Sequence, residues 1–239
     1  MLDNLQDLNV TDVFYKGKLV DRNAPIRVKT CGRALKHTVH LDKVKAEQFV
    51  LPIGKKKTHV IGINPSQITT EDLAVSLQPA ANYVPTDGYS KVAAVERHHN
   101  TGKIGVAVAK GYGIRNGAVA SSVSHDSHNI IVIGDNDRDM ALAVDEIIRT
   151  QGGYTVVENG EVFETLPLPI MGLMSDAGFE SVNETLGRMI KKAHEMGVPA
   201  DIEPFITLSF LALPAIPALR ITPRGLCLLT AKGPEILQE

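Results

Sequence analysis

The chain has 239 residues, 44% of them hydrophobic and 22% charged, which is enough apolar material to bury a globular core. A formal net charge of −2 and the lack of tryptophan argue against a nucleic-acid partner, which needs a basic surface and aromatic stacking. The two cysteines, Cys31 and Cys227, are too few and too far apart for a disulfide framework or a cysteine-based zinc site.

The sequence also gives no sign of export or membrane insertion. Residues 1–7 are acidic and lack a hydrophobic export core, and no run approaches the roughly 18 apolar residues of a membrane-spanning helix. We therefore expect a cytoplasmic protein without membrane contact.

Residues 10–20 contain the first predicted element. A β-rich run leads to a Lys-Gly turn at Lys16 and Gly17, and a second short run follows. This pattern predicts a β-hairpin.

Strands and helices alternate further along the chain. The sequence predicts helices over residues 137–150, with Asp137 as a candidate N-cap, and over residues 181–196, with Gly197 as the stop. Short β-branched or alternating runs predict strands at residues 59–64, 91–98, 104–109, 129–133 and 154–158. This order predicts an α/β or α+β layered domain with a mixed sheet and flanking helices.

Proton-transferring side chains precede the strand predicted at residues 129–133. His125, Asp126, Ser127 and His128 lie where a loop enters the sheet, with Ser121 and Ser122 just before them. A histidine has a pKa near 6.5, so this group could donate to a bound ligand or orient a catalytic water. The segment is therefore a candidate site.

Two other interpretations of this segment stay open. The aspartate and serine could form turn hydrogen bonds, with the histidines as ordinary loop residues. Alternatively, His125, Asp126 and His128 could bind a metal ion, although imidazoles three residues apart on a strand point to opposite faces unless the backbone turns between them.

Two neighbouring segments carry further candidates. Alternation along the strand ending at residue 98 places Glu96 and His98 on one face and Arg97 on the other, as a site or as a structural salt bridge. Asp176 ends a methionine-containing segment, where it could bind a ligand or cap a turn.

These segments, with residues 167–176 and 204–214, closely resemble the C-terminal domain of bacterial adenine deaminases, in the amidohydrolase superfamily. The resemblance extends roughly from Val10 to Thr222. It implies a role in hydrolysing adenine to hypoxanthine and ammonia in purine salvage. In that family a β/α barrel holds manganese or iron, and this chain has no His-x-His motif to form such a centre.

The resemblance also implies a domain organisation and an activity. Residues 1–28 correspond to a β-hairpin from the sandwich beside the barrel, and residues 29–239 to the C-terminal α/β domain. We expect this chain to bind no metal of its own and, without the barrel, to be inactive. Adenine, the missing barrel domain and further copies in a homo-oligomer are the expected partners.

The densest part of the resemblance assigns the site residues. It implies that His125, Asp126 and His128 close or shape the adenine pocket from the substrate side, accessory to the absent metal centre. Substrate-binding residues would be Ser121, Ser122, Ser127, His98 and Asp176. Two competing hypotheses remain: a non-catalytic structural or oligomerisation domain with interfaces at residues 166–174 and 205–217, and a stand-alone module that binds a small ligand.

Overall fold

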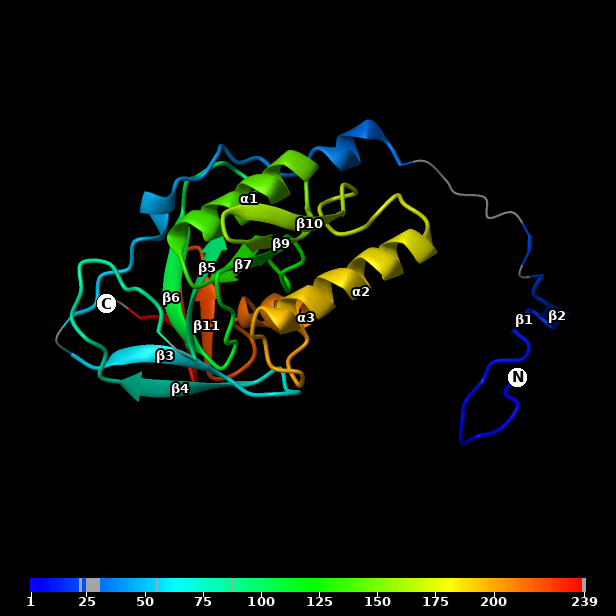
Figure 1. Cartoon of the computed structure of the whole chain (residues 1–239), viewed down its shortest axis with the longest axis horizontal. Coiled ribbons are helices and arrows are strands. Elements are labelled where there is room, and N and C mark those ends of the chain that lie inside the picture. The colour runs from blue at the N-terminus through cyan, green and yellow to red at the C-terminus, as the bar shows by residue number, and fades with distance from the viewer. Residues whose placement is uncertain (22, 25–30, 55, 87, 238–239) are drawn as a thin grey trace. The chain divides into compact units, whose positions relative to one another are not determined.

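The computed structural model describes residues 1–21, 23–24, 31–54, 56–86 and 88–237. The chain divides into two compact units, Met1–Cys31 and Gly32–Glu239 (Figure 1). The domain boundary predicted after residue 28 lies outside the described residues. Among the described residues, no helix is both long enough and apolar enough to cross a membrane.

The first unit contains the predicted hairpin. Strands β1 (Phe14–Tyr15) and β2 (Lys18–Leu19) pair antiparallel, with Phe14 opposite Leu19. The Lys16-Gly17 turn takes positive φ angles of 50° and 74°, which suit the glycine. The hairpin prediction is therefore confirmed.

A mixed eight-stranded sheet forms the centre of the second unit. Its strand order is β10-β9-β7-β8-β5-β6-β3-β4, and β3 and β6 are parallel while the other neighbours are antiparallel. The strands are β3 (Thr58–Ile63), β4 (Thr70–Val75), β5 (Tyr89–Val95), β6 (Ile104–Lys110), β7 (Gly117–Ser121), β8 (Ile130–Gly134), β9 (Gly153–Glu158) and β10 (Glu161–Pro167).

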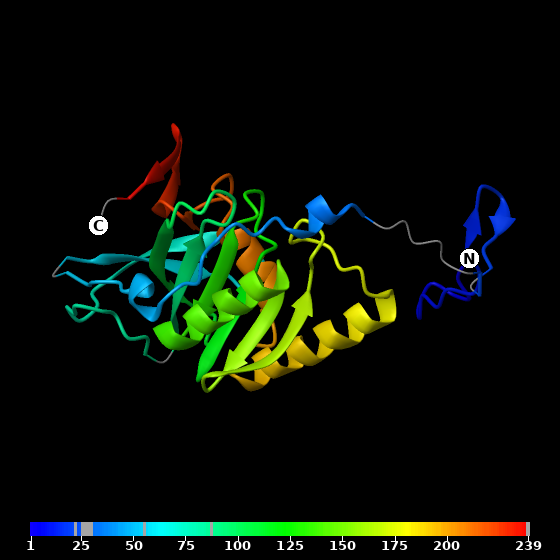
Figure 2. The ribbon, with the colours of Figure 1, turned by 90° about the horizontal axis from the view of Figure 1, so that it is seen from above.

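Both faces of this sheet are covered, which confirms the predicted layered arrangement. Helix α1 (Asp137–Thr150) packs on one face, and helices α2 (Phe179–Glu195) and α3 (Pro204–Leu211) lie on the other (Figures 1 and 2). A three-stranded sheet of β11 (Leu219–Thr222), β12 (Gly225–Thr230) and β13 (Gly233–Ile236) also packs on the second face.

The apolar run of β8 shows why the strand was predictable. Ile131 and Ile133 belong to the core beneath α2 and α3, whereas Ile130 and Val132 pack against the α1 side. Because both faces are buried, each residue of the run is apolar.

Several details differ from the predictions. Asn136, not Asp137, caps α1: its side chain accepts a hydrogen bond from the amide of Asp139 at 2.9 Å. The Asp137 carboxylate instead binds the buried Lys91 ammonium at 2.5 Å. In addition, β7 occupies a glycine- and alanine-rich stretch where no strand was predicted. No element was predicted for β4, β10, β11, β12, β13 or α3 either.

Candidate functional site

Residues 121–129, here called the histidine loop, connect β7 to β8 at the end of the sheet where β5 finishes. The loop contacts the segment after β5, because the His98 ring donates from Nε2 to the Ser127 carbonyl at 2.8 Å. His98 and Ser127, which are distant in sequence, therefore lie together at this end of the sheet.

Ser121 and Ser122 hold the start of the histidine loop. Both are fully buried. The Ser121 hydroxyl accepts from the Val123 amide at 2.9 Å, and the Ser122 hydroxyl donates to the Gly172 carbonyl at 2.6 Å. The two serines thus connect the loop to the backbone around it.

The buried side chain of Arg97 holds the histidine loop by hydrogen bonds to backbone carbonyls. Its Nε donates to the carbonyl of His128, Nη1 to that of Thr38 at 3.2 Å, and Nη2 to that of Met171 at 3.0 Å. Burial lowers the pKa of Arg97 to about 10, so the guanidinium is charged at neutral pH. One cation therefore holds three segments that lie far apart in the sequence.

The alternative of a salt bridge between Glu96 and Arg97 is wrong. The Glu96 carboxylate instead accepts hydrogen bonds from the amides of His98 and Thr101, at 2.5 and 3.1 Å. Glu96 therefore shapes the turn after β5.

His125 presents its imidazole at the surface of the loop. The ring stacks on Phe210 of α3 with centroids 4.8 Å apart, and its Nδ1 lies 3.3 Å from the Asp126 carboxylate. The side chain of Asp126 is 86% exposed and that of His125 43%. Both are accessible to a molecule that approaches this end of the sheet.

His128 lies deeper than His125. Its backbone has a φ of 49°, in the left-handed region, and its amide donates to the Ser124 carbonyl at 2.6 Å. Burial, followed by the nearby charges of Arg97 and His125, lowers the pKa of His128. The ring is therefore neutral at neutral pH and can both donate and accept a hydrogen bond.

Three buried polar atoms around this loop have no hydrogen-bond partner within the part of the chain that the structure describes. They are Nδ1 of His128 and the hydroxyl oxygens of Ser124 and Ser209. Ser209 belongs to α3, and its carbonyl accepts from the His125 amide at 3.0 Å. Such atoms are costly in a folded protein, and they often mark a place where a ligand, water or partner binds.

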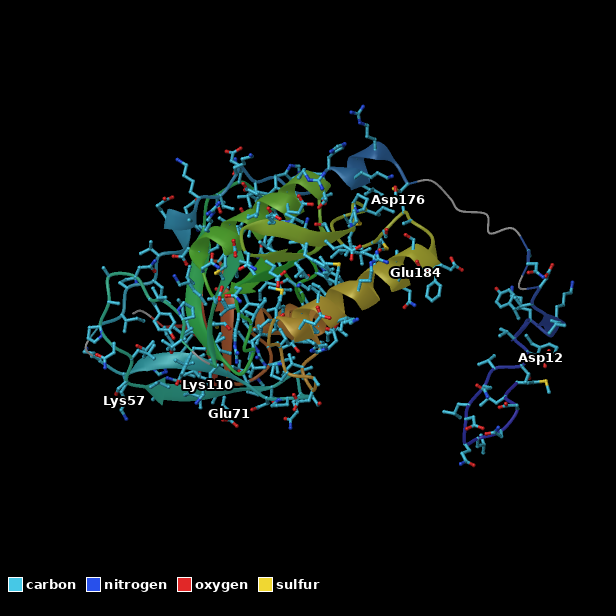
Figure 3. All side chains as sticks on the ribbon, viewed as in Figure 1. Asp12, Lys57, Glu71, Lys110, Asp176 and Glu184 are labelled. Atoms are coloured by element: carbon cyan, nitrogen blue, oxygen red, sulfur yellow. The ribbon has the colours of Figure 1, made fainter. Side chains whose placement is uncertain are left out.

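Asp176 has a different neighbour from the other predicted residues. Its carboxylate pairs with Lys36 of the 3-10 helix η1 (Arg33–Lys36), and this hydrogen bond lowers the pKa of Asp176. Figure 3 shows Asp176 between η1 and the start of α2. The residue is therefore tied to the edge of the site rather than to the histidine loop.

A cavity of about 400 Å³ is lined in part by Phe210. His194, Glu203 and Phe210 are among its described lining residues, and none of the predicted site residues is among them. Burial raises the pKa of Glu203, whose carboxylate caps α3. Phe210 therefore contacts both His125 and this cavity, whereas His125 is not among the lining residues.

The described residues do not fit a metal centre. No group of three or more histidine, cysteine, aspartate or glutamate side chains among them is arranged to hold an ion. His125 is occupied by Phe210 and Asp126, while Nδ1 of His128 is buried. The metal-ligand interpretation of this loop is thus unsupported, and we assign no metal-dependent step to these residues.

Sequence reasoning missed the residues that support the loop. Arg97 was considered for a salt bridge, and Gly172 was not singled out at all. A Cβ atom on Gly172, whose φ is +70°, would lie 2.7 Å from Nη1 of Arg97. The only sequence signal was a glycine in a loop, which is common.

Fold and candidate site together define a layered α/β domain that presents two imidazoles on a loop held by a buried arginine. Residues 67–232 match the model of the adenine deaminase C-terminal domain, and the chain belongs to that family.

Full-length relatives place this domain in longer proteins. An adenine deaminase of Desulfitobacterium hafniense is 49% identical over 228 residues, which cover 95% of this chain and 40% of the relative. One from Nitratidesulfovibrio vulgaris (strain DP4) is 44% identical over 232 residues, with 95% and 40% coverage. "Adenine deaminase 2" of Carboxydothermus hydrogenoformans is 39% identical, with 95% and 41% coverage. The chain thus spans about 40% of the length of these relatives.

Proposed function

We propose that this chain acts as the C-terminal domain of an adenine deaminase, which converts adenine to hypoxanthine and ammonia in purine salvage. In this proposal the histidine loop closes or shapes the adenine pocket, and the rest of the enzyme supplies the metal centre. The observation that carries it is the pair of imidazoles at 125 and 128, held on a loop by a buried arginine.

The chemistry of adenine suits this arrangement. The purine ring offers acceptor nitrogens and an exocyclic amine donor, and loss of that amine requires a proton. His128 is neutral because its pKa is lowered, so it can donate to a ring nitrogen or accept from the amine. His125 and Asp126 are exposed beside it, and they can complete the wall of a pocket.

A hybrid enzyme tests this proposal. In the hybrid, this chain replaces the matching 40% of the Desulfitobacterium hafniense adenine deaminase. Adenine turnover and metal content are measured for the hybrid and for the 239-residue chain alone, each with added manganese, iron or zinc.

We expect turnover by the hybrid and none by the chain alone. Metal-dependent turnover by the pure chain would contradict the proposed division of labour, and it would restore the metal-ligand interpretation of His125, Asp126 and His128. A hybrid that folds and holds metal but does not turn over adenine would contradict the claim that this chain completes the site.

A further inference from the structure

Four large apolar side chains are exposed in the segments 33–36 and 171–179. They come from η1, from the loop between β10 and α2, and from the first residue of α2. Their exposed fractions are 42% for Leu35, 43% for Met171, 52% for Met174 and 76% for Phe179. Single exposed apolar residues are ordinary, but several large ones on neighbouring segments usually mark an interaction surface.

Backbone contacts hold these segments in place. The Met171 amide donates to the Leu35 carbonyl at 2.7 Å, and Ile170 and Met174 exchange two backbone hydrogen bonds of 3.0 and 3.1 Å. The Lys36–Asp176 ion pair links η1 to the same loop. Leu35, Met171 and Met174 therefore sit on a hydrogen-bonded backbone support, and the Lys36–Asp176 pair adds polar groups beside them, as at the edges of protein interfaces.

The same surface is joined to the candidate site. Arg97 binds the Met171 carbonyl with Nη2 and the His128 carbonyl with Nε. A partner that covers Met171 and Met174 would thus lie next to the imidazoles. Methionine side chains also adapt easily to a partner surface.

The chain enters the second unit at this surface. η1, which carries Leu35, is the first element of the unit that begins at Gly32. The family model that matches residues 67–232 is that of a C-terminal domain. The aligned 95% of this chain covers 40% of each of two long relatives, so about 60% of each relative lies outside the alignment. Polypeptide that precedes the domain is tethered beside η1, which raises its effective concentration there.

We propose that Leu35, Met171, Met174 and Phe179, here called the apolar face, are the docking surface for the preceding part of an adenine deaminase. This inference rests on the proposed function and adds the face through which the domain meets the rest of the enzyme. Docking there places the histidine loop against the partner, while the opposite end of the sheet stays free.

Hydrogen exchange on the hybrid enzyme and on the free chain tests the docking surface. We expect amides in residues 33–36 and 171–179 to exchange about tenfold or more slowly in the hybrid, because exchange there reports local opening. The hairpin of β3 and β4 should exchange equally in both proteins. Equal exchange of the apolar face in both would overturn the proposal, as would protection in the free chain that grows with its concentration, which identifies a second copy as the occupant.

A double substitution, Met174→Asp with Phe179→Asp, provides the second readout. Both side chains are exposed, so the free chain should keep its melting temperature, while the hybrid should lose the protection of residues 33–36 and 171–179. Val84→Asp is the matched control, since Val84 is 71% exposed on a loop elsewhere, and it should leave the protection intact. Unchanged protection in the double variant would contradict the proposal.

This pattern separates the two proposals. If the apolar face is protected in the hybrid but His128→Ala retains full turnover, docking holds and the catalytic role of the loop fails. If His128→Ala lowers turnover but the apolar face is unprotected, the loop acts as proposed and docking occurs elsewhere.

Discussion

Two buried arginines, Arg97 and Arg220, occupy similar environments and serve different parts of the molecule. Burial lowers the pKa of each to about 10, and each donates to several backbone carbonyls. Arg220 binds the carbonyls of Ile216 at 3.0 Å, Pro217 at 2.8 Å and Ile68 at 2.7 Å. Taken alone, both are structural cations that satisfy carbonyls within the fold.

The two arginines differ in the side chains carried by the segments that they bind. The Arg97 partners are Thr38, His128 and Met171, so that arginine joins the entry to the domain, the histidine loop and the apolar face. Arg220 mainly secures the turn before its own strand. A buried arginine is therefore no evidence of function by itself, and the side chains carried by its partners decide which one supports a site.

Replacing each arginine by methionine gives the largest expected effects. Each substitution leaves buried carbonyls without donors, so we expect each to lower the free energy of unfolding by about 3 kcal/mol, measured by urea denaturation. In the hybrid enzyme, well below the melting temperature, Arg97→Met should also reduce kcat/KM about 100-fold, because loss of positioning moves catalytic groups. Arg220→Met should keep near-normal kcat/KM. Equal losses of activity would remove the distinction between the two regions.

Gly172, which lies against the Arg97 guanidinium, tests the support of the histidine loop with a smaller expected loss of unfolding free energy. Gly172→Ala forces a Cβ against the guanidinium at a φ of +70°, so we expect a loss of about 2 kcal/mol in unfolding free energy. Gly187→Ala, in the exposed part of α2 with open space around it, should instead stabilise the domain by about 0.5–1 kcal/mol. Thermal unfolding of both variants measures these changes in unfolding free energy. A Gly172→Ala variant as stable as the parent would show that the Arg97 side chain moves aside at little cost.

Two histidines, each beside a carboxylate, test whether any exposed histidine of this kind affects kcat/KM or only one in the histidine loop. His125 lies 3.3 Å from the Asp126 carboxylate and His59 lies 2.8 Å from that of Asp72, and the two imidazoles are 43% and 40% exposed. In the hybrid, His125→Ala should lower kcat/KM about tenfold, as expected for one positioned polar group. His59→Ala should not change it. Equal effects would assign the loss to general surface changes.

The pH dependence of stability should show the smallest effect. The folded-state pKa of His128 is lowered by burial, so the unfolded chain binds this proton more tightly and stability falls as pH drops below about 6.5 toward the folded-state pKa. His128→Gln should show a weaker fall over that window, measured by denaturation between pH 7 and 5. Identical profiles would contradict the buried position of the ring.

The sequence predicted best where a local pattern coincides with burial. β8 is apolar at every position because both its faces are covered, and α1 has a clear amphipathic period. β7 escaped prediction because its small residues have weak strand preference, although it lies in the middle of the sheet.

Only the histidines of the candidate site, and not the residues that support them, could be predicted from the sequence. Residue type pointed to His125 and His128, and resemblance reinforced them. Their support depends on Arg97 and the carbonyls of residues 38 and 171, which come together only through the tertiary fold. Any residue type has a carbonyl, so no spacing in the sequence encodes such a partner.

The central claim is that His128 faces the adenine pocket, and His128→Ala in the hybrid enzyme tests it most directly. We expect kcat/KM for adenine to fall on the order of ten- to a thousand-fold, with metal content unchanged because the proposed metal centre belongs to the rest of the enzyme. The control is His194→Ala. It removes an imidazole on α2 that is hydrogen-bonded to the Val198 carbonyl, and it should leave kcat/KM near that of the parent. A His128→Ala hybrid with full metal and parental kcat/KM would contradict the claim.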